Sequence, residues 1–215
     1  MEKRYESDMT RKEKRQNELK KLKSMTFKQK AAYIWEYYKG VFAGIIIACV
    51  IISIGVQMFQ NSQLKSLLSI AVVDSNYNHD EQVEALQNDF LAYAGTGDKH
   101  EVVDVDTSLL SGDDYNAVVK MTVVMGAGTA DMMFCGEETY KKYKQQEAFL
   151  NWKEILGDDY SKYEEYMTDD GRLDLEKCPN WEKYNMVYYS PVYAVVMSSS
   201  KNLENCIKFL EMMVQ

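Results

Sequence analysis

The stretch Val41-Phe-Ala-Gly-Ile-Ile-Ile-Ala-Cys-Val-Ile-Ile-Ser-Ile-Gly-Val56 determines how this chain is organised, because it is apolar and carries no charge. Uncharged residues extend it from Gly40 to Leu64, between Lys39 and Lys65. About 19 residues at ~1.5 Å each form a helix of roughly 28 Å, close to the hydrocarbon thickness of a bilayer. A helix that is apolar on every side does not suit the surface of a soluble domain. We therefore predict a transmembrane helix over residues 41–59.

Charge is distributed unequally on the two sides of this helix. The chain has 25 basic and 33 acidic residues, of which residues 1–40 contain 12 and 6, so residues 41–215 contain 13 and 27. The net charges are +6 before the apolar stretch and −14 from it onward. Basic flanks remain on the cytoplasmic side. We expect residues 1–25 to be a cytoplasmic basic tail, disordered or at most a frayed helix, and the C-terminal domain to be extracellular at the cell membrane.

Two other kinds of leader share this order of a basic segment and an apolar run. A cleaved signal peptide has an apolar core of about 7–15 residues, whereas the run here is longer and no small-x-small cleavage site follows it. The tetrad Ile46-Ile-Ala-Cys49 has the form of a lipoprotein cleavage box, but the apolar run continues beyond Cys49. We favour an uncleaved signal anchor with a cysteine inside the membrane.

Residues 26–40 are predicted to form a short interfacial helix that leads into the span. Thr26 and Gln29 have the spacing of a capping box. Aromatic side chains suited to the depth of the lipid headgroups follow at Tyr33, Trp35, Tyr37 and Tyr38. The phrase from Lys28 to Lys39 resembles the juxtamembrane segment of small anchored proteins from Gram-positive anaerobic bacteria.

Residues 62–215 are enough for one domain. The apolar run Leu67–Val73 is typical of a strand buried on both faces. Further strands are expected at 101–105, 130–135 and 188–197, with helices between them and a last helix from Leu203 to Val214. This alternation predicts an α/β fold with a mostly parallel sheet and helices on both faces. The polar residues 158–183 suggest a surface excursion.

Residues 115–125 are ambiguous between strand and helix. Val118, Val119, Val123 and Val124 favour a strand by propensity. They are grouped in adjacent pairs, however, and do not alternate with a period of two. A serine cap at Ser111 and a stop at Gly126 favour a helix, which is the interpretation we adopt.

Three phrases, at 128–134, 148–156 and 192–211, together resemble the first lobe of extracellular solute-binding proteins of ATP-driven importers, the type II periplasmic-binding fold. They are Gly-Thr-Ala-Asp-Met-Met-Phe, Ala-Phe-Leu-Asn-Trp-Lys-Glu-Ile-Leu, and a returning strand followed by Asn-Leu-Glu-Asn-Cys-Ile-Lys-Phe-Leu-Glu. The resemblance implies one lobe of that fold. Only residues 157–183 lie where the family crosses into its second lobe, so this domain would be a lobe without its partner.

In open α/β sheets, ligands bind beyond the carboxyl ends of the strands. The residues expected there are Asp74, Asp106, Cys135, Gly136, Tyr189 and Ser190. Without an opposing lobe, a small ligand would be covered only in part, so any binding of a free solute is expected to be weak.

Catalytic, cofactor and metal motifs do not stand out in the sequence. There are two histidines, one before and one after a predicted helix, and HExxH, GxxxxGKS, GxSxG and paired CxxC are absent. We therefore expect no metal and no cofactor. Cys135, ahead of a helix N-terminus, is the one candidate nucleophile, although a buried structural cysteine is the commoner situation. Cys135, Cys178 and Cys206 are an odd number of thiols, and we expect no disulfide among them.

The charge of −14 excludes nucleic acid and anionic lipid as partners of the C-terminal domain and leaves cationic ligands, cell-envelope components or another protein. Our first hypothesis is a single-pass, non-enzymatic extracellular binding or scaffold module. A solute receptor for an importer is the alternative, and a cell-envelope hydrolase is a more distant one. A polar and aromatic pocket at the strand ends would favour the receptor, and a flat apolar patch there would favour the scaffold.

Overall fold

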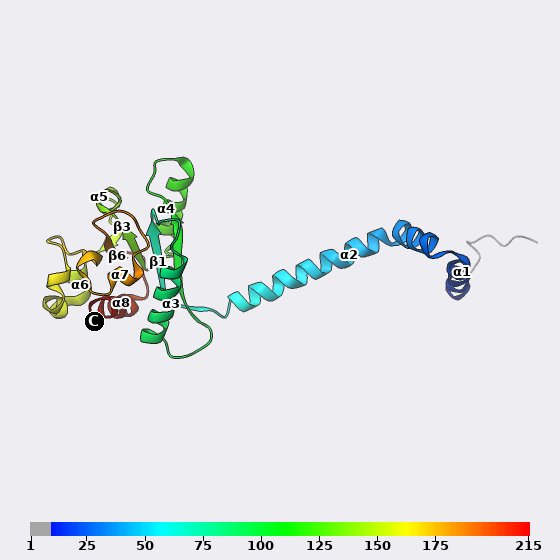
Figure 1. Ribbon diagram of the computed structural model, residues 1–215, viewed down its shortest axis with the longest axis horizontal. Helices are drawn as coiled ribbons and strands as arrows, with labels where there is room; N and C mark the ends of the chain where they lie inside the picture. The colour runs from blue at the N-terminus through cyan, green and yellow to red at the C-terminus, as the bar shows by residue number, and fades with distance from the viewer. Residues whose placement is uncertain (1–9) are drawn as a thin grey trace, which may run out of the picture. The chain divides into compact units, whose positions relative to one another are not determined.

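The computed structural model describes residues 10–215 and divides the chain into two compact units, Met1–Ser62 and Gln63–Gln215 (Figure 1). The first unit contains α1 (Arg11–Ser24) and α2 (Phe27–Asn61). Most of the basic tail is therefore a helix, while the part of this prediction that falls on residues 1–9 lies outside the described residues. The segment Tyr38–Asn61 has 24 residues, none of them buried, and among residues 10–215 it is the one helix long and apolar enough to cross a membrane. This is consistent with single-pass anchoring.

The predicted interfacial helix and the predicted span form one continuous helix. The Thr26 N–H donates to Gln29 Oε1 at 3.1 Å, as the capping-box spacing predicted. From Phe27 the helix runs without a break through residues 41–59. No Pro interrupts this helix. Because the hydrocarbon core of a membrane contains no water, the backbone groups of a spanning segment form their hydrogen bonds within the helix.

The second unit alternates strands and helices before it ends in a series of short elements. Its elements are β1 (Lys65–Val73), α3 (Asp80–Ala94), β2 (Glu101–Leu109), α4 (Tyr115–Ala127), β3 (Met132–Cys135), α5 (Glu137–Lys144), β4 (Phe149–Leu150), α6 (Trp152–Leu156), the 3-10 helices η2 (Gly157–Lys162) and η3 (Glu164–Tyr166), β5 (Leu173–Asp174), the 3-10 helix η4 (Leu175–Lys177), α7 (Trp181–Tyr184), β6 (Tyr193–Met197) and α8 (Leu203–Val214).

The strands form one mixed sheet in the order β2-β1-β3-β6-β4, with β5 also paired to β6. β1 has a parallel neighbour on each side, because Ile70 lies opposite Val105 of β2 and Met132 of β3. β6 returns antiparallel to β3, with Val195 opposite Met133. The α/β prediction with a mostly parallel central sheet is confirmed, and β1, the second strand in the order, is an interior strand.

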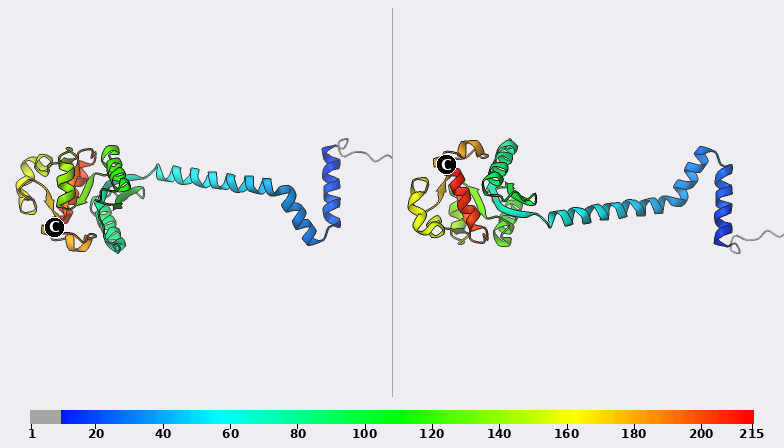
Figure 2. Two further views of the ribbon diagram at one scale, coloured as in Figure 1. Left: turned by 90° about the horizontal axis from the view of Figure 1, so that it is seen from above. Right: turned by 90° about the horizontal axis from the view of Figure 1, so that it is seen from below.

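Alternate residues of the strands point into two separate apolar clusters, one on each face of the sheet. On β1, Leu68, Ile70 and Val72 pack with residues of α3 and α8, whereas Ala71 and Val73 pack with residues of α4 and α5. Figure 2 shows α5 in front when the domain is seen from above and α8 in front when it is seen from below. Helices therefore cover both faces, as a fully apolar strand requires.

Residues 115–125 are helical, as we had favoured, but different residues end the helix. The Asp114 carboxylate accepts hydrogen bonds from the N–H groups of Asn116 and Ala117, so Asp114 and not Ser111 is the cap. Gly126 lies inside α4, and the helix ends at Gly128, whose φ of +61° is readily adopted by glycine.

The prediction of a surface excursion at 158–183 holds for residues 158–166, none of which is buried, and is wrong for the rest. Met167, Leu173, Leu175 and Trp181 are buried, and they belong to the same cluster as α3 and α8. Leu173 also pairs with β6. The error has a physical cause: the short 3-10 turns here give the apolar residues no helix or strand period, so their common direction is invisible in the sequence.

A buried carboxylate connects three parts of the sheet. Asp131 is 6% exposed, and its carboxylate accepts from Ser69 N–H at 3.0 Å, Ser200 Oγ–H at 2.8 Å and the Asn202 amide at 3.0 Å. Its own N–H donates to Ser69 O, and its carbonyl accepts from Met197 N–H, both at 2.8 Å. Asp131 thereby joins β1, the start of β3 and the loop between β6 and α8.

Candidate functional site

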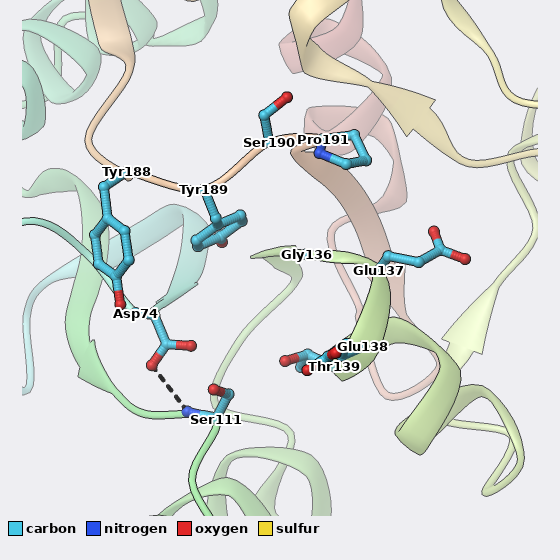
Figure 3. Close-up of a pocket in the computed structure, with 10 residues that line it drawn as sticks. All are labelled: Asp74, Ser111, Gly136, Glu137, Glu138, Thr139, Tyr188, Tyr189, Ser190 and Pro191. Atoms are coloured by element: carbon cyan, nitrogen blue, oxygen red, sulfur yellow. Dashed lines mark hydrogen bonds between the residues drawn. The ribbon is translucent and has the colours of Figure 1, made fainter.

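A pocket of about 310 Å³ opens at the carboxyl ends of β1 and β3 (Figure 3). Its walls come from four segments: the residue after β1, the loop after β2, the first turn of α5, and the residues before β6. The lining residues are Asp74, Ser111, Gly136, Glu137, Glu138, Thr139, Tyr188, Tyr189, Ser190 and Pro191. This is the sheet edge at which open α/β sheets bind ligands.

Two hydrogen bonds to neighbouring backbone groups hold Asp74 in place. Its φ is +52°, in the left-handed region that Asp tolerates better than most residues. Its N–H donates to Leu109 O at 2.9 Å, and one of its carboxylate oxygens, Oδ1, accepts from Ser111 N–H at 3.0 Å. Within residues 10–215, Asp74 Oδ2 has no hydrogen-bond partner, so that oxygen can accept from a ligand.

Tyr189 closes the floor of the pocket. Its hydroxyl donates to Val73 O at 2.9 Å and also lies 3.4 Å from Phe134 O, so it connects the C-terminal ends of β1 and β3. Burial raises the pKa of the Tyr189 phenol well above its ordinary value, so it stays protonated. A Cβ at Gly136 would lie 3.2 Å from the Tyr189 ring, which explains why the smallest residue occupies that position.

The two glutamates that open α5 have different surroundings. Glu137 forms an ion pair with Arg172. The Cζ of Arg172 lies over the rings of Tyr140 and Tyr193, 4.3 and 4.0 Å from their centroids. Hydrogen bonds from Arg172 and Lys141 lower the pKa of Glu137 to about 2. Figure 3 shows the Glu137 side chain turned away from the pocket. Its charge is therefore compensated outside the pocket.

Glu138 and Thr139 point into the pocket (Figure 3). Glu138 is exposed, and the described part of the chain shows no ion pair to its carboxylate. Thr139 is only 6% exposed, and within residues 10–215 its hydroxyl has no hydrogen-bond partner. The pocket thus contains two carboxylates without an ion-pair partner, those of Asp74 and Glu138, and one hydroxyl, that of Thr139, without a hydrogen-bond partner in the protein.

The outer rim is aromatic and polar. Tyr188 is 76% exposed, and its ring meets that of Tyr189 edge-on at 6.1 Å between centroids. Ser190 is exposed and donates to Glu176 Oε2 at 2.9 Å. The Ser190–Pro191 peptide bond is cis.

Of the six residues predicted at this edge, the structure brings four together: Asp74, Gly136, Tyr189 and Ser190. Asp106 is not among them, because β2 continues to Leu109 and Asp106 lies within the strand. Partial burial opposes ionisation of Asp106, but hydrogen bonds from Ser108 and Lys120 prevail and lower its pKa. The strand was predicted to end at residue 105. Because β2 continues for four more residues, Asp106 does not lie at the end of the strand as predicted.

Cys135 is the second residue that does not reach the pocket. Its side chain lies on the face of the sheet that α4 and α5 cover, and it is fully buried in that cluster. Burial raises the pKa of the Cys135 thiol to about 12, which opposes its use as a nucleophile. Cys135, Cys178 and Cys206 are all buried and free.

Six lining residues were not predicted: Ser111, Glu137, Glu138, Thr139, Tyr188 and Pro191. The sequence carried a signal for some of them, because the first turn of the helix after β3 must face the same edge as the end of β3. Ser111 carried none, since its place depends on where β2 ends.

The electrostatics of the site are one-sided. Acidic residues line the pocket at three positions, and no Lys, Arg or His lines it. Within residues 10–215 no group of three or more His, Cys, Asp or Glu side chains is arranged to hold a metal ion. The arrangement therefore suits a cation that donates hydrogen bonds. Comparisons of the chain with family models, with curated proteins and with solved structures found no match, so the resemblance to solute-binding proteins stays a prediction.

Proposed function

We propose that this chain is a single-pass, membrane-anchored binding module without enzymatic activity, whose C-terminal domain faces the outside of the cell. The proposed orientation rests on the charge difference between residues 1–40 and the rest of the chain. The observation that carries the proposed binding role is the pocket at the carboxyl edge of the sheet, with two uncompensated carboxylates and an aromatic rim.

A protein partner that inserts one side chain suits this pocket better than a free solute does. A volume of about 310 Å³ is at the lower end of small-molecule sites. In a single lobe, nothing closes over the ligand from the other side, so a free molecule keeps part of its surface in water. A side chain inserted by a larger partner gains further contacts around the rim.

The rim offers such contacts. Tyr77 and Tyr188 are 102% and 76% exposed, and they belong to neighbouring segments, because Ser75 pairs with Val187 and Asn76 N–H donates to Met186 O. Exposed tyrosines are frequent anchors of protein interfaces because they bury a large area with few rotatable bonds. An interface of the usual size, roughly 800 Å² on each partner, would cover the pocket and both tyrosines.

The test is site-specific photocrosslinking in native membranes. A benzophenone amino acid at Tyr188 is expected to capture a discrete protein, and the same group at Tyr93 is not. Tyr93 is a matched control, since it is an exposed tyrosine near the end of α3 that leads into β2, at the opposite edge of the sheet. Capture should be lost on Asp74→Asn and retained on Asp158→Asn, which removes an equal charge from η2. Equal capture from both tyrosines, or no effect of Asp74→Asn, would contradict the proposal.

A solute receptor for an importer is the second candidate, and the concave, polar and aromatic shape of the pocket favours it over a flat scaffold. It predicts micromolar binding of a free small molecule, seen as a rise in melting temperature that increases with the logarithm of ligand concentration. No rise at millimolar concentrations of amino acids, amines, sugars and short peptides would remove this candidate.

A further inference from the structure

We infer that the pocket at the ends of β1 and β3 binds an alkylammonium group, such as a lysine side chain presented by a partner or a free primary amine. This inference rests on the proposed binding role of the same pocket and specifies its ligand. It starts from the three groups that the fold leaves unsatisfied there, on Asp74, Glu138 and Thr139.

The first group is fixed before any ligand arrives. The Asp74 carboxylate is held by Ser111 N–H through Oδ1, and its backbone is tied to Leu109. Oδ2 is thereby oriented without a cost in side-chain freedom at the moment of binding. A preoriented carboxylate is a strong acceptor for a charged N–H donor, because charge-assisted hydrogen bonds are about twice as strong as neutral ones.

The second observation is the Thr139 hydroxyl. A hydroxyl that opens into a pocket from an otherwise buried side chain can accept a hydrogen bond from a ligand there. Thr139 is 6% exposed, its hydroxyl lacks a partner among residues 10–215, and Figure 3 shows its side chain directed into the pocket beside Glu138. An ammonium group has three N–H donors, which matches the acceptors on Asp74, Glu138 and Thr139.

The negative charge of the pocket lining excludes an anionic ligand. The N-terminus of α5 would by itself attract an anion, but Glu137 and Glu138 already occupy its first turn, and Asp74 faces it. Arg172 and Lys141 form ion pairs with Glu137. A carboxylate or phosphate ligand would therefore meet uncompensated negative charge. The ring of Tyr188 at the rim suits the alkyl chain of an amine and the cation itself.

The experiment is isothermal titration calorimetry on the full chain in nanodiscs of phosphatidylcholine, a lipid without net charge. The ligands are acetyl-Gly-Lys-Gly-amide, its norleucine counterpart, its Nε-acetyl-lysine counterpart, and butylammonium. We expect the lysine peptide to bind at least tenfold more tightly than either neutral peptide. Butylammonium distinguishes a free amine from a lysine side chain as the natural ligand. If butylammonium binds as tightly as the lysine peptide, the ligand is a free amine. If it binds more weakly, the ligand is a side chain of a partner.

Substitutions of the lining residues test whether the lysine peptide binds in this pocket. Asp74→Asn and Glu138→Gln should each weaken the lysine peptide at least fivefold, and Thr139→Val, which keeps the shape of the side chain, about threefold. Asp158→Asn should leave it unchanged. Glu138 is exposed, so Glu138→Gln tests the inference even if another variant unfolds, and a melting curve of each variant identifies such cases.

Affinities for the lysine and norleucine peptides within twofold of each other would overturn the inference, as would an unchanged affinity in both carboxylate variants. If the lysine peptide does not bind but Tyr188 captures a protein, the proposed docking role stands and the ammonium ligand is rejected. Binding of the lysine peptide without any crosslinked partner would reject the docking role and keep the ligand.

Discussion

Asp131 is the residue whose removal should reveal most about what holds the C-terminal domain together. Its carboxylate accepts three hydrogen bonds, from Ser69 N–H, the Ser200 hydroxyl and the Asn202 amide, while it is 6% exposed. Asp131→Ala leaves all three donors without an acceptor. Each unsatisfied buried donor costs about 1–3 kcal/mol. The Ser69 N–H is fixed in the strand, but the two side chains can turn in part toward water, so we expect a total loss of about 3–5 kcal/mol.

Asp131→Asn is the matched variant. An asparagine oxygen in the place of Oδ2 still accepts from Ser69 and Asn202, and its amide in the place of Oδ1 can donate to Ser200 Oγ if that hydroxyl turns. Ser200 Oγ lies 4.0 Å from Cys206 Sγ, which gives the turned hydroxyl another acceptor. All contacts are kept and only the charge is lost, so we expect a cost of about 1 kcal/mol.

The assay is urea unfolding of the fragment 63–215, with Asp158→Ala as an exposed control that should change the free energy of unfolding by less than about 0.5 kcal/mol. The fragment is suitable because both apolar clusters consist only of its own residues. If the alanine and asparagine variants lose the same free energy, or if both lose less than about 1 kcal/mol, Asp131 is not the connection that its hydrogen bonds indicate.

Three further predictions concern the core, the pH dependence and the orientation. Ile70 is 1% exposed with parallel strands on both sides, so Ile70→Asp should cost several kcal/mol and unfold the domain, and an unchanged melting curve would refute its central place. The folded pKa of Glu137 is about 2 against an ordinary 4.5, so its ion pair with Arg172 stabilises the fold fully above pH 4.5 and loses this effect as the pH falls toward 2. Melting temperature should therefore fall less steeply over that interval in Glu137→Gln than in the unchanged chain, and identical slopes would contradict the assignment. For orientation, a cysteine replacing Gln215 should react with an impermeant thiol reagent on intact cells, and one replacing Thr10 should not. The native thiols of the domain are buried and stay unlabelled. The reverse pattern would place the domain inside the cell.

Features that depend on a local pattern of residues were predictable from the sequence. The uncharged run at 41–59 predicted a helix of membrane length, because length and apolarity are properties of consecutive residues. The apolar run at 67–73 predicted a strand with both faces buried. These signals require no knowledge of distant residues.

Tertiary structure alone decided the features that depend on where distant segments meet. β2 continues to Leu109 because its pairing with β1 extends that far, and this pairing removes Asp106 from the pocket and brings Ser111 into it. Cys135 and Gly136 are adjacent in the chain, yet residues of α4, α5 and β6 bury the first, while the second lies beyond the strand and lines the pocket. The residues 158–183 read as polar surface, and only their packing against α3 and α8 shows that Leu173 and Trp181 belong to the core. In each case the deciding interaction joins residues far apart in sequence, which a local pattern cannot encode.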